Sequence, residues 1–237
     1  MIILALDALD FNPVLRYKCK HLKQTEYGQI NVSDFKILRT VALWASFLSG
    51  KNMEEDVPLD KETQWKFKLE PEKTFLPFFE TYKAIDVPAF SFKQRNHSKE
   101  RSLMRRGFED ESSIEDFDSA VWRNHLENKK EFFKSLSKHD LVMGYFDLAD
   151  AIGHLSFGVP KKMKEVYVEL EEIAKEVKSS FDDFILIASD HGMKSNGRYG
   201  EHSGNGFYSV NHKLRLTSTR ITDFYNFTKK IAKKSYF

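Results

Sequence analysis

The sequence has little of what several common kinds of site require. It contains a single cysteine, Cys19, so the chain can form no internal disulfide and no CxxC zinc site. No apolar run approaches the roughly 18 residues of a membrane span. The apolar opening at residues 1–6 is too short for a signal peptide. We therefore expect a cytoplasmic protein without a membrane partner.

Signatures of nucleotide and nucleic-acid binding are also missing. The sequence has no G-x-x-x-x-G-K-[ST], G-x-G-x-x-G or G-x-S-x-G motif. The 37 Lys and Arg residues are interleaved with 35 Asp and Glu, which gives a formal net charge of +2. Nucleic-acid-binding proteins usually present a basic face instead. We expect no nucleic-acid partner, although the basic tail at 229–234 leaves salt-dependent binding as a less favoured alternative.

What the sequence does have is a set of short apolar runs that end in acidic residues. They are residues 2–6 with Asp7, residues 141–146 with Asp147 and Asp150, and residues 185–188 with Asp190 and His191. Such runs are typical of buried parallel strands, whose carboxyl ends carry the sites of open α/β proteins. A helical pattern over 161–178 separates the last two runs and indicates a strand–helix–strand unit. The sequence therefore predicts an α/β fold with a mixed, mostly parallel sheet between helices.

Weaker patterns predict the remaining elements. A helix is predicted at 41–49, capped by Thr40 and closed by Gly50, and further helices at 118–136 and 221–237. Short strands are predicted at 87–92 and 207–210. Polar loops, the first of them a loop or lid, are predicted at 96–116 and 193–206. We expect one domain over 1–237, with a small cap or lid inserted at about 51–136. The aromatic residues of 65–82 form either the core of this cap or a platform on which a base stacks.

Carboxylates and imidazoles gather near the ends of the predicted strands. The candidate ligands are Asp7, Asp150, His154, Asp190, His191 and His202. Asp150 and His154 are four residues apart, so they can share one helix face. Carboxylates with imidazoles and no thiolate cluster suit Zn²⁺ or Mn²⁺. Six ligands are too many for one catalytic ion, but they suit two ions about 3.5–4 Å apart that promote phosphoryl transfer.

Thr40 is the candidate nucleophile of such a site. A threonine hydroxyl is inert at neutral pH unless a metal or a base lowers its pKa. At a helix N-terminus it also meets free N–H groups and the positive end of the helix dipole, which favour a phosphate. The alternative for Thr40 is a helix cap. Ser46 and Ser49 are poorer nucleophile candidates because they lie inside the predicted helix.

Other polar residues are assigned to supporting roles. Asp147 competes with Asp150 as a ligand but suits a structural role, and Asp10 suits a turn. The histidines with a solvated or structural assignment are His21, His97, His125, His139 and His212. Lys51, Arg105 and Arg106 could contact a substrate phosphate, although charged loops usually face water.

The order of these motifs resembles the alkaline phosphatase superfamily, and within it the type I phosphodiesterase/nucleotide pyrophosphatase branch. The motifs are the opening strand with Asp7-Ala8-Leu9, Thr40 ten residues ahead of Gly50, D-x-x-G-H at 150–154, S-D-H-G-M at 189–193, and His202. They span the chain from Asp7 to about Asn211, and 51–140 is least covered. Ala8 and Ala42 depart from the Gly and Pro that the family often has. No C/S-x-P-x-R sequence exists for the formylglycine of a sulfatase.

The resemblance implies two metal ions and phosphoryl transfer through Thr40. Its ligand sets are Asp7, Thr40, Asp190 and His191 for one ion, and Asp150, His154 and His202 for the other. Thr40 would attack phosphorus and form a phospho-threonine intermediate, which water then hydrolyses. We expect hydrolysis of a phosphodiester or pyrophosphate bond in a small-molecule phosphate ester or nucleotide, with two divalent ions, zinc or manganese. The alternatives are a phosphomonoesterase or phosphomutase of the same superfamily, or a catalytically silent metal- or nucleotide-binding protein.

Overall fold

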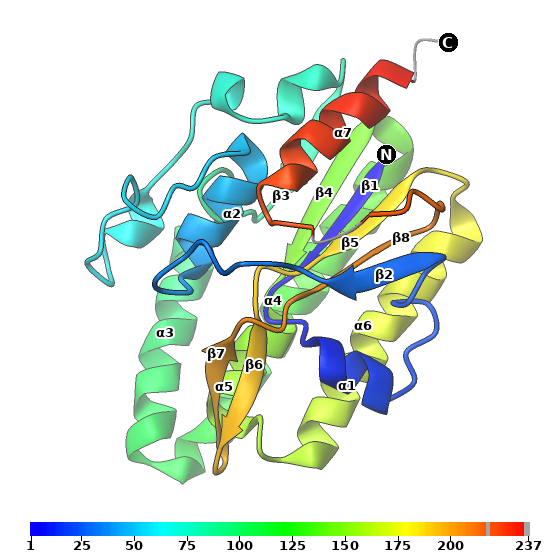
Figure 1. Ribbon diagram of the computed structural model, residues 1–237. Helices are drawn as coiled ribbons and strands as arrows, with labels where there is room; N and C mark the ends of the chain where they lie inside the picture. Colours follow the sequence, from blue (N-terminus) through cyan, green and yellow to red (C-terminus); the bar gives the residue numbers. More distant parts are fainter. Residues whose placement is uncertain (217–218, 235–237) are drawn as a thin grey trace.

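The main sheet runs through the middle of the protein (Figure 1). In this computed structural model, which describes residues 1–216 and 219–234, the sheet has six strands in the order β2-β8-β5-β1-β4-β3. The strands are β1 (Ile2–Leu6), β2 (Glu26–Gln29), β3 (Tyr82–Ile85), β4 (Leu141–Phe146), β5 (Ile185–Ala188) and β8 (Phe207–Val210). β1, β3, β4 and β5 are parallel, whereas β8 runs antiparallel to β5 and β2 runs antiparallel to β8. The predicted fold class, a mixed and mostly parallel α/β sheet, is confirmed.

The register of the central strands brings three carboxyl ends to one edge of the sheet. β1 lies between β4 and β5, with Leu6 opposite Phe146 and Ala5 opposite Ala188. The polar residues that follow each of these strands therefore leave the sheet side by side. This edge is where the candidate site lies.

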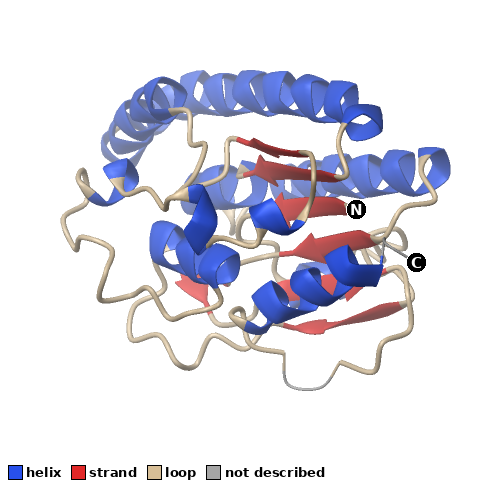
Figure 2. Cartoon of the chain, turned by 90° about the horizontal axis from the view of Figure 1, so that it is seen from above, coloured by secondary structure: helices blue, strands red, loops and turns tan. Residues whose placement is uncertain are grey.

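Helices cover both faces of the sheet (Figure 2). They are α1 (Phe11–Arg16), α2 (Thr40–Ser49), α3 (Gln94–Glu109), α4 (Ile114–Ser135), α5 (Leu148–Ser156), α6 (Pro160–Ser180) and α7 (Asp223–Lys234). Short 3-10 turns are η1 (Gln64–Lys66), η2 (Pro71–Lys73), η3 (Leu76–Phe78), η4 (Glu111–Ser113) and η5 (Leu136–Lys138). Among the described residues, no helix is both long enough and apolar enough to cross a membrane.

The two faces of the sheet bury separate apolar cores because side chains alternate along each strand. In β1, Ile3 packs into the core shared with α2 and α7, whereas Ile2 packs into the core shared with α4, α5 and α6. The sheet is thus buried on both faces, which explains why its central strands are apolar throughout.

Three local predictions are wrong. Residues 87–92 are not a strand: the edge strand β3 ends at Ile85, and the positive φ values of Asp86 (59°) and Ala89 (60°) turn the chain away. Residues 96–116 are not a loop but form most of α3 and the start of α4. Residues 193–206 are not a loop either, because β6 (Gly192–Asn196) and β7 (Tyr199–Ser203) form a hairpin there.

The other local predictions agree with the structure to within a few residues. The strand at 207–210 is β8, and the helix at 118–136 is α4. The last predicted helix corresponds to α7, and residues 235–237 lie outside the described residues. Thr40 is the first residue of α2 and Arg39 occupies the cap position. The cap insertion at 51–136 stays a prediction; within that range β3 and α4 belong to the main layers.

Gly50 ends α2 where the helix contacts α7, and this contact can be tested. Its φ is 70°, and a Cβ at this position would lie 2.7 Å from Tyr225 Cβ. Gly197 has a similar φ of 62°, but no atom lies within 4 Å of a Cβ built there. We expect Gly197→Ala to lower the free energy of unfolding by about 1 kcal/mol, through left-handed strain. Gly50→Ala should cost about 1–3 kcal/mol more because Tyr225 must move. Urea denaturation measures both, and equal losses would contradict the close packing of α7 on α2.

Candidate metal centre

The first part of the site is a buried cluster at the ends of β1 and β5. Asp7, Asp190 and His191 are fully buried, and one ligand atom from each lies within 4.8 Å of the others. His191 Nε2 is 3.3 Å from Asp7 Oδ1 and 3.4 Å from Asp190 Oδ2. Asp7 follows directly on β1, and Asp190 and His191 lie two and three residues beyond the end of β5, which pairs with β1 in parallel. The fold therefore places two acids and one imidazole around a common point.

Each residue of this cluster uses its outer polar atom in a hydrogen bond within the protein. The Tyr145 hydroxyl donates to Asp7 Oδ2, and the Ala8 N–H donates to Asp190 Oδ1 at 3.4 Å. His191 Nδ1 lies 3.0 Å from Gly192 O, so Nδ1 carries the proton and Nε2 keeps its lone pair. The inner atoms are then left to face one another. Asp7 Oδ1, Asp190 Oδ2 and His191 Nε2 have no hydrogen-bond partner among the described residues.

The polar atoms that face one another in this buried cluster would be stabilised by a cation. Burial raises the pKa of Asp7, and it raises the pKa of Asp190 to about 7. Burial also lowers the pKa of His191 to about 3, so this imidazole is neutral at pH 7. Three lone pairs that converge in a buried site are costly unless a proton or a cation lies between them. This donor set fits a divalent metal ion.

A second cluster adjoins the first. Asp150 and His154 lie one turn apart on α5, and His202 comes from β7. Asp150 Oδ1 is 3.4 Å from His154 Nε2 and 3.2 Å from His202 Nε2, and the two Nε2 atoms are 3.3 Å apart. His202 Nδ1 donates to Leu38 O at 2.9 Å, which again leaves Nε2 directed at the cluster. These residues also fit a metal ion.

When no cation is bound, a shared proton stabilises the close approach of the polar atoms in the second cluster. Burial lowers the pKa of His202, but the hydrogen bond and charge of Asp150 outweigh burial and raise it to about 9. Burial likewise opposes ionisation of Asp150, yet His154 and His202 hold the pKa of this carboxyl well below its usual range. A metal ion that binds here must therefore displace a proton.

The two clusters form one continuous site. The rings of His191 and His202 stack with their centroids 3.8 Å apart, and ligand atoms of Asp150, His191 and His202 lie within 4.8 Å of one another. All six carboxylate and imidazole residues expected from the sequence thus come together. Their role as metal ligands stays a prediction.

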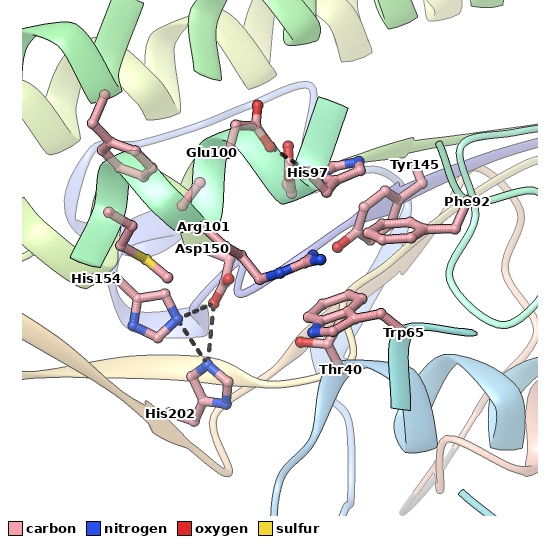
Figure 3. A pocket seen from close by; sticks show the side chains of 14 residues that line it. Thr40, Trp65, Phe92, His97, Glu100, Arg101, Tyr145, Asp150, His154 and His202 are labelled. Carbon is pink, nitrogen blue, oxygen red and sulfur yellow. Dashed lines mark hydrogen bonds and ion pairs between the residues drawn. The ribbon is translucent and has the colours of Figure 1, made fainter. Parts of the chain in front are cut away.

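Thr40 lies at a cavity beside these residues (Figure 3). The cavity has a volume of about 130 Å³, and Thr40, Asp150, His154 and His202 are among the residues that line it. Thr40 begins α2, whose first N–H groups have no partner within the helix. The Arg39 side chain does not cap them and instead donates to three backbone carbonyls, those of Glu54, Val57 and Pro58. The positive end of α2 is therefore directed at the cavity.

Met193 sets the spacing between the two elements that carry His154 and His202. A Cβ on Gly153 of α5 or on Gly200 of β7 would overlap Met193 Sδ. Glycine at both positions lets α5 and β7 pack closely against this side chain. The Met of the S-D-H-G-M motif therefore lies between the two elements that carry His154 and His202, whose Nε2 atoms are 3.3 Å apart.

Asp10 holds the β6–β7 hairpin in place, which the sequence reading missed. As predicted for a turn residue, its Oδ1 accepts a hydrogen bond from the Asn12 N–H at 2.8 Å. Its Oδ2 also accepts from the Met193 N–H at 3.1 Å and from Ser203 Oγ at 3.3 Å. The chain separation of more than 180 residues between these partners left no local signal in the sequence.

Tyr145 is a second residue that the sequence reading missed. It lines the cavity from β4, and its hydroxyl is the donor to Asp7. Burial raises the pKa of Tyr145 well above its ordinary value, so the hydroxyl keeps its proton. This hydrogen bond orients Asp7 with the free oxygen toward His191.

His97 was expected to be solvated or structural, and the structure buries it in the cavity wall. Nε2 lies 3.0 Å from Asp86 Oδ2, and Nδ1 lies 2.9 Å from Glu100 Oε2 and 3.3 Å from Asp147 Oδ2. Burial lowers the pKa of His97, but hydrogen bonds that its ring donates to Asp147, Asp86 and Glu100 raise the pKa well above its ordinary value. A protonated imidazole therefore accounts for this group of acids without a metal ion.

Comparisons with known proteins find matches among solved structures. No family model matches the chain, and no curated protein matches its sequence. Among solved structures, the fold is similar to murine ectonucleotide pyrophosphatase/phosphodiesterase 5, with 13% identity, a TM-score of 0.48 and 84% of this chain covered. The chain spans 58% of that protein's chain. It is also similar to the PsFucS1 sulfatase from Pseudoalteromonas sp., with 11% identity, a TM-score of 0.49, and coverage of 98% of this chain and 67% of that one.

We expect the affinity for Mn²⁺ to increase as the pH rises from about 6 to about 8, because protons compete for the ligands. The competing protons are those on Asp190 and His202, whose pKa values are about 7 and about 9. Calorimetric titration in two buffers with different ionisation enthalpies should detect proton release. At about 100 times the dissociation constant, the ion should raise the free energy of unfolding by about 2.7 kcal/mol.

A matched pair of variants makes this test specific. His202→Gln should weaken binding and reduce the proton release, whereas His212→Gln, at an exposed histidine, should leave both unchanged. Metal affinity that does not vary with pH would contradict the proposed ligands.

We expect His97→Gln to lower the free energy of unfolding by about 3 kcal/mol, as for removal of one partner from a buried ion pair. The pKa of His97 is raised in the folded state, so its stabilisation is complete below the ordinary value of 6.5 and is lost as the pH rises through the folded-state pKa. Urea unfolding should therefore show a smaller difference between variant and wild type at alkaline pH. His21→Gln serves as the control. A difference that is constant with pH would contradict a charged His97.

Proposed function

We propose that the protein is a metal-dependent hydrolase of phosphodiester or pyrophosphate bonds, with Thr40 as the nucleophile. One observation carries the proposal: Thr40 lines the same small cavity as Asp150, His154 and His202. The buried first cluster adjoins these residues through the stacked rings of His191 and His202. A hydroxyl next to two sets of carboxylate and imidazole ligands suits two-metal phosphoryl transfer.

In this reaction some residues of the chain would hold the metal ions, and Thr40 would attack phosphorus. The residues that would hold the two ions are Asp7, Thr40, Asp190 and His191 for one, and Asp150, His154 and His202 for the other. Bound divalent ions would lower the pKa of the Thr40 hydroxyl and offset the charge on the non-bridging phosphoryl oxygens. Thr40 Oγ bonds to phosphorus as the bond to the leaving oxygen breaks. A water oxygen then bonds to phosphorus, and the bond to Thr40 Oγ breaks.

The N-terminus of α2 supports the phosphoryl group during both steps. Its free N–H groups and the positive end of its dipole face the cavity at Thr40, where the negative charge lies. Tyr145 keeps Asp7 oriented through its hydroxyl hydrogen bond. The groups that meet the substrate are thus fixed before it binds.

The size of the cavity favours a second candidate, a phosphomonoesterase. Pockets for drug-sized ligands measure roughly 300–1,000 Å³, whereas this cavity measures about 130 Å³. It accommodates a phosphoryl group and a small attached group more readily than a whole nucleotide. Zn²⁺ and Mn²⁺ are both compatible with the donor set.

The nucleophile is tested with bis-p-nitrophenyl phosphate in the presence of Zn²⁺ or Mn²⁺. We expect Thr40→Ala to lower kcat at least about 1,000-fold, as for loss of a nucleophile, and Thr40→Ser to retain part of the activity. Ser49→Ala, on the same helix but outside the cavity lining, should behave as wild type. Full activity of Thr40→Ala would overturn the assignment of the nucleophile. A metal-loaded wild type that hydrolyses no phosphate monoester, diester or pyrophosphate would support a silent metal-binding protein instead.

A further inference from the structure

Arg101 brings a positive charge into the wall of the cavity. It lies on α3 and lines the cavity together with Thr40. In Figure 3 its side chain extends across the cavity toward Trp65. The guanidinium carbon lies 5.0 Å from the centre of the Trp65 ring. The sequence reading singled out Arg105 and Arg106 but not this residue.

A column of stacked rings holds the guanidinium of Arg101 in place. Trp65 stacks on Phe92 with centroids 4.9 Å apart, and Phe92 stacks on His97 with centroids 4.0 Å apart. Trp65, Phe92 and His97 also line the cavity. A guanidinium that lies on an aromatic ring keeps its N–H groups free along its edge, where they can bind an anion with two hydrogen bonds.

Arg101 forms no ion pair with a carboxylate in the described part of the chain. Among the described residues no Asp or Glu oxygen lies within 4.0 Å of it, and its hydrogen bond is from Nη2 to Ser98 Oγ at 3.3 Å. Arg105, one turn further along α3, is exposed and forms an ion pair with Glu62. Arg101 is half-buried, and burial lowers its pKa. The charges of Glu62 and Glu100 act against this lowering, but neither carboxylate forms an ion pair with Arg101, and a partly desolvated guanidinium without such a contact is well suited to an anionic ligand.

The acids in the same cavity wall contact histidines rather than Arg101. Glu100 and Asp147 contact the His97 imidazole at 2.9 Å and 3.3 Å, and His97 is protonated. Asp150 faces His154 and His202. Among the described residues that line the cavity, Arg101 is the one Arg or Lys side chain, and it is free to bind a ligand.

We propose that Arg101 is a specificity-determining residue that binds a second negatively charged phosphoryl oxygen of the substrate. This inference rests on the proposed function. The cavity is small, so a phosphoryl group that Thr40 attacks has its remaining oxygens, or a phosphoryl group joined to it, within reach of Arg101. Both sources present the same chemistry, a negatively charged phosphoryl oxygen in addition to the single negative charge that a diester carries. The protein therefore prefers phosphomonoesters or pyrophosphates over diesters with two uncharged ester groups.

The test compares three substrates with the Mn²⁺-loaded wild type, Arg101→Met and the control Arg105→Met. The substrates are p-nitrophenyl phosphate, inorganic pyrophosphate and bis-p-nitrophenyl phosphate. Arg101→Met should lower kcat/KM about 10- to 100-fold for an anionic substrate, the effect expected for a hydrogen bond between charged groups. It should change hydrolysis of the diester little. A loss on p-nitrophenyl phosphate assigns the contact to the reacting phosphoryl group, and a loss on pyrophosphate alone assigns it to the adjoining one.

Arg105→Met should match wild type on all three substrates. Arg101→Lys keeps the charge without the planar fork and should fall between wild type and Arg101→Met. An equal loss on all three substrates, or no loss on any, would overturn the role of Arg101 in specificity.

A binding measurement separates this inference from the proposed function. Inorganic phosphate and pyrophosphate should raise the unfolding temperature of the wild type, and Arg101→Met should abolish this shift. If the wild type hydrolyses none of the substrates but shows the shift, the proposed function fails and anion binding by Arg101 stands. If phosphate and pyrophosphate shift wild type and Arg101→Met equally, the inference fails whatever the activity.

Discussion

The convergence of lone pairs at the carboxyl edge of the sheet is the constraint on which the rest of the site depends. Asp7, Asp190 and His191 direct one atom each at a common point and satisfy the other atom with a protein hydrogen bond. Such an arrangement is unfavourable in a buried site unless a cation or proton lies at its centre. The parallel pairing of β1 with β5 keeps these residues together in spite of that cost. The packing of the sheet thus holds together three lone pairs that repel one another unless a cation or a proton lies between them.

The sequence was sufficient to predict which acids and imidazoles come together because the relevant rules are local. Asp7 follows directly on an apolar strand, Asp190 lies two residues beyond another, and parallel strands carry their carboxyl ends to the same edge of a sheet. Asp150 and His154 needed no more than helical spacing. Ala8 stands where the family often has Gly. Its φ of 53° is a backbone conformation that glycine adopts with less strain, which agrees with that preference. The fold class could be predicted for the same reason.

The parts that could not be predicted depend on partners far apart in the chain. The charge of residues 96–116 indicated a loop, yet α3 is held by polar contacts such as those of His97 with Asp86 and Asp147. The β6–β7 hairpin lacks an alternating apolar pattern because Asp10 and the packing of Met193 fix it in place. Trp65 belongs to a 3-10 turn and reaches the cavity only through its stacking on Phe92. Periodicity carries no information about such contacts.

Helix α3 connects Arg101 with the candidate metal ligands. His97 and Arg101 are four residues apart, so they share one face of the helix. His97 contacts Asp147, the residue from which α5 begins, and α5 carries Asp150 and His154. Because α3 lines the cavity and also contacts the start of α5, the helix that carries Arg101 supports the element that carries two of the candidate ligands.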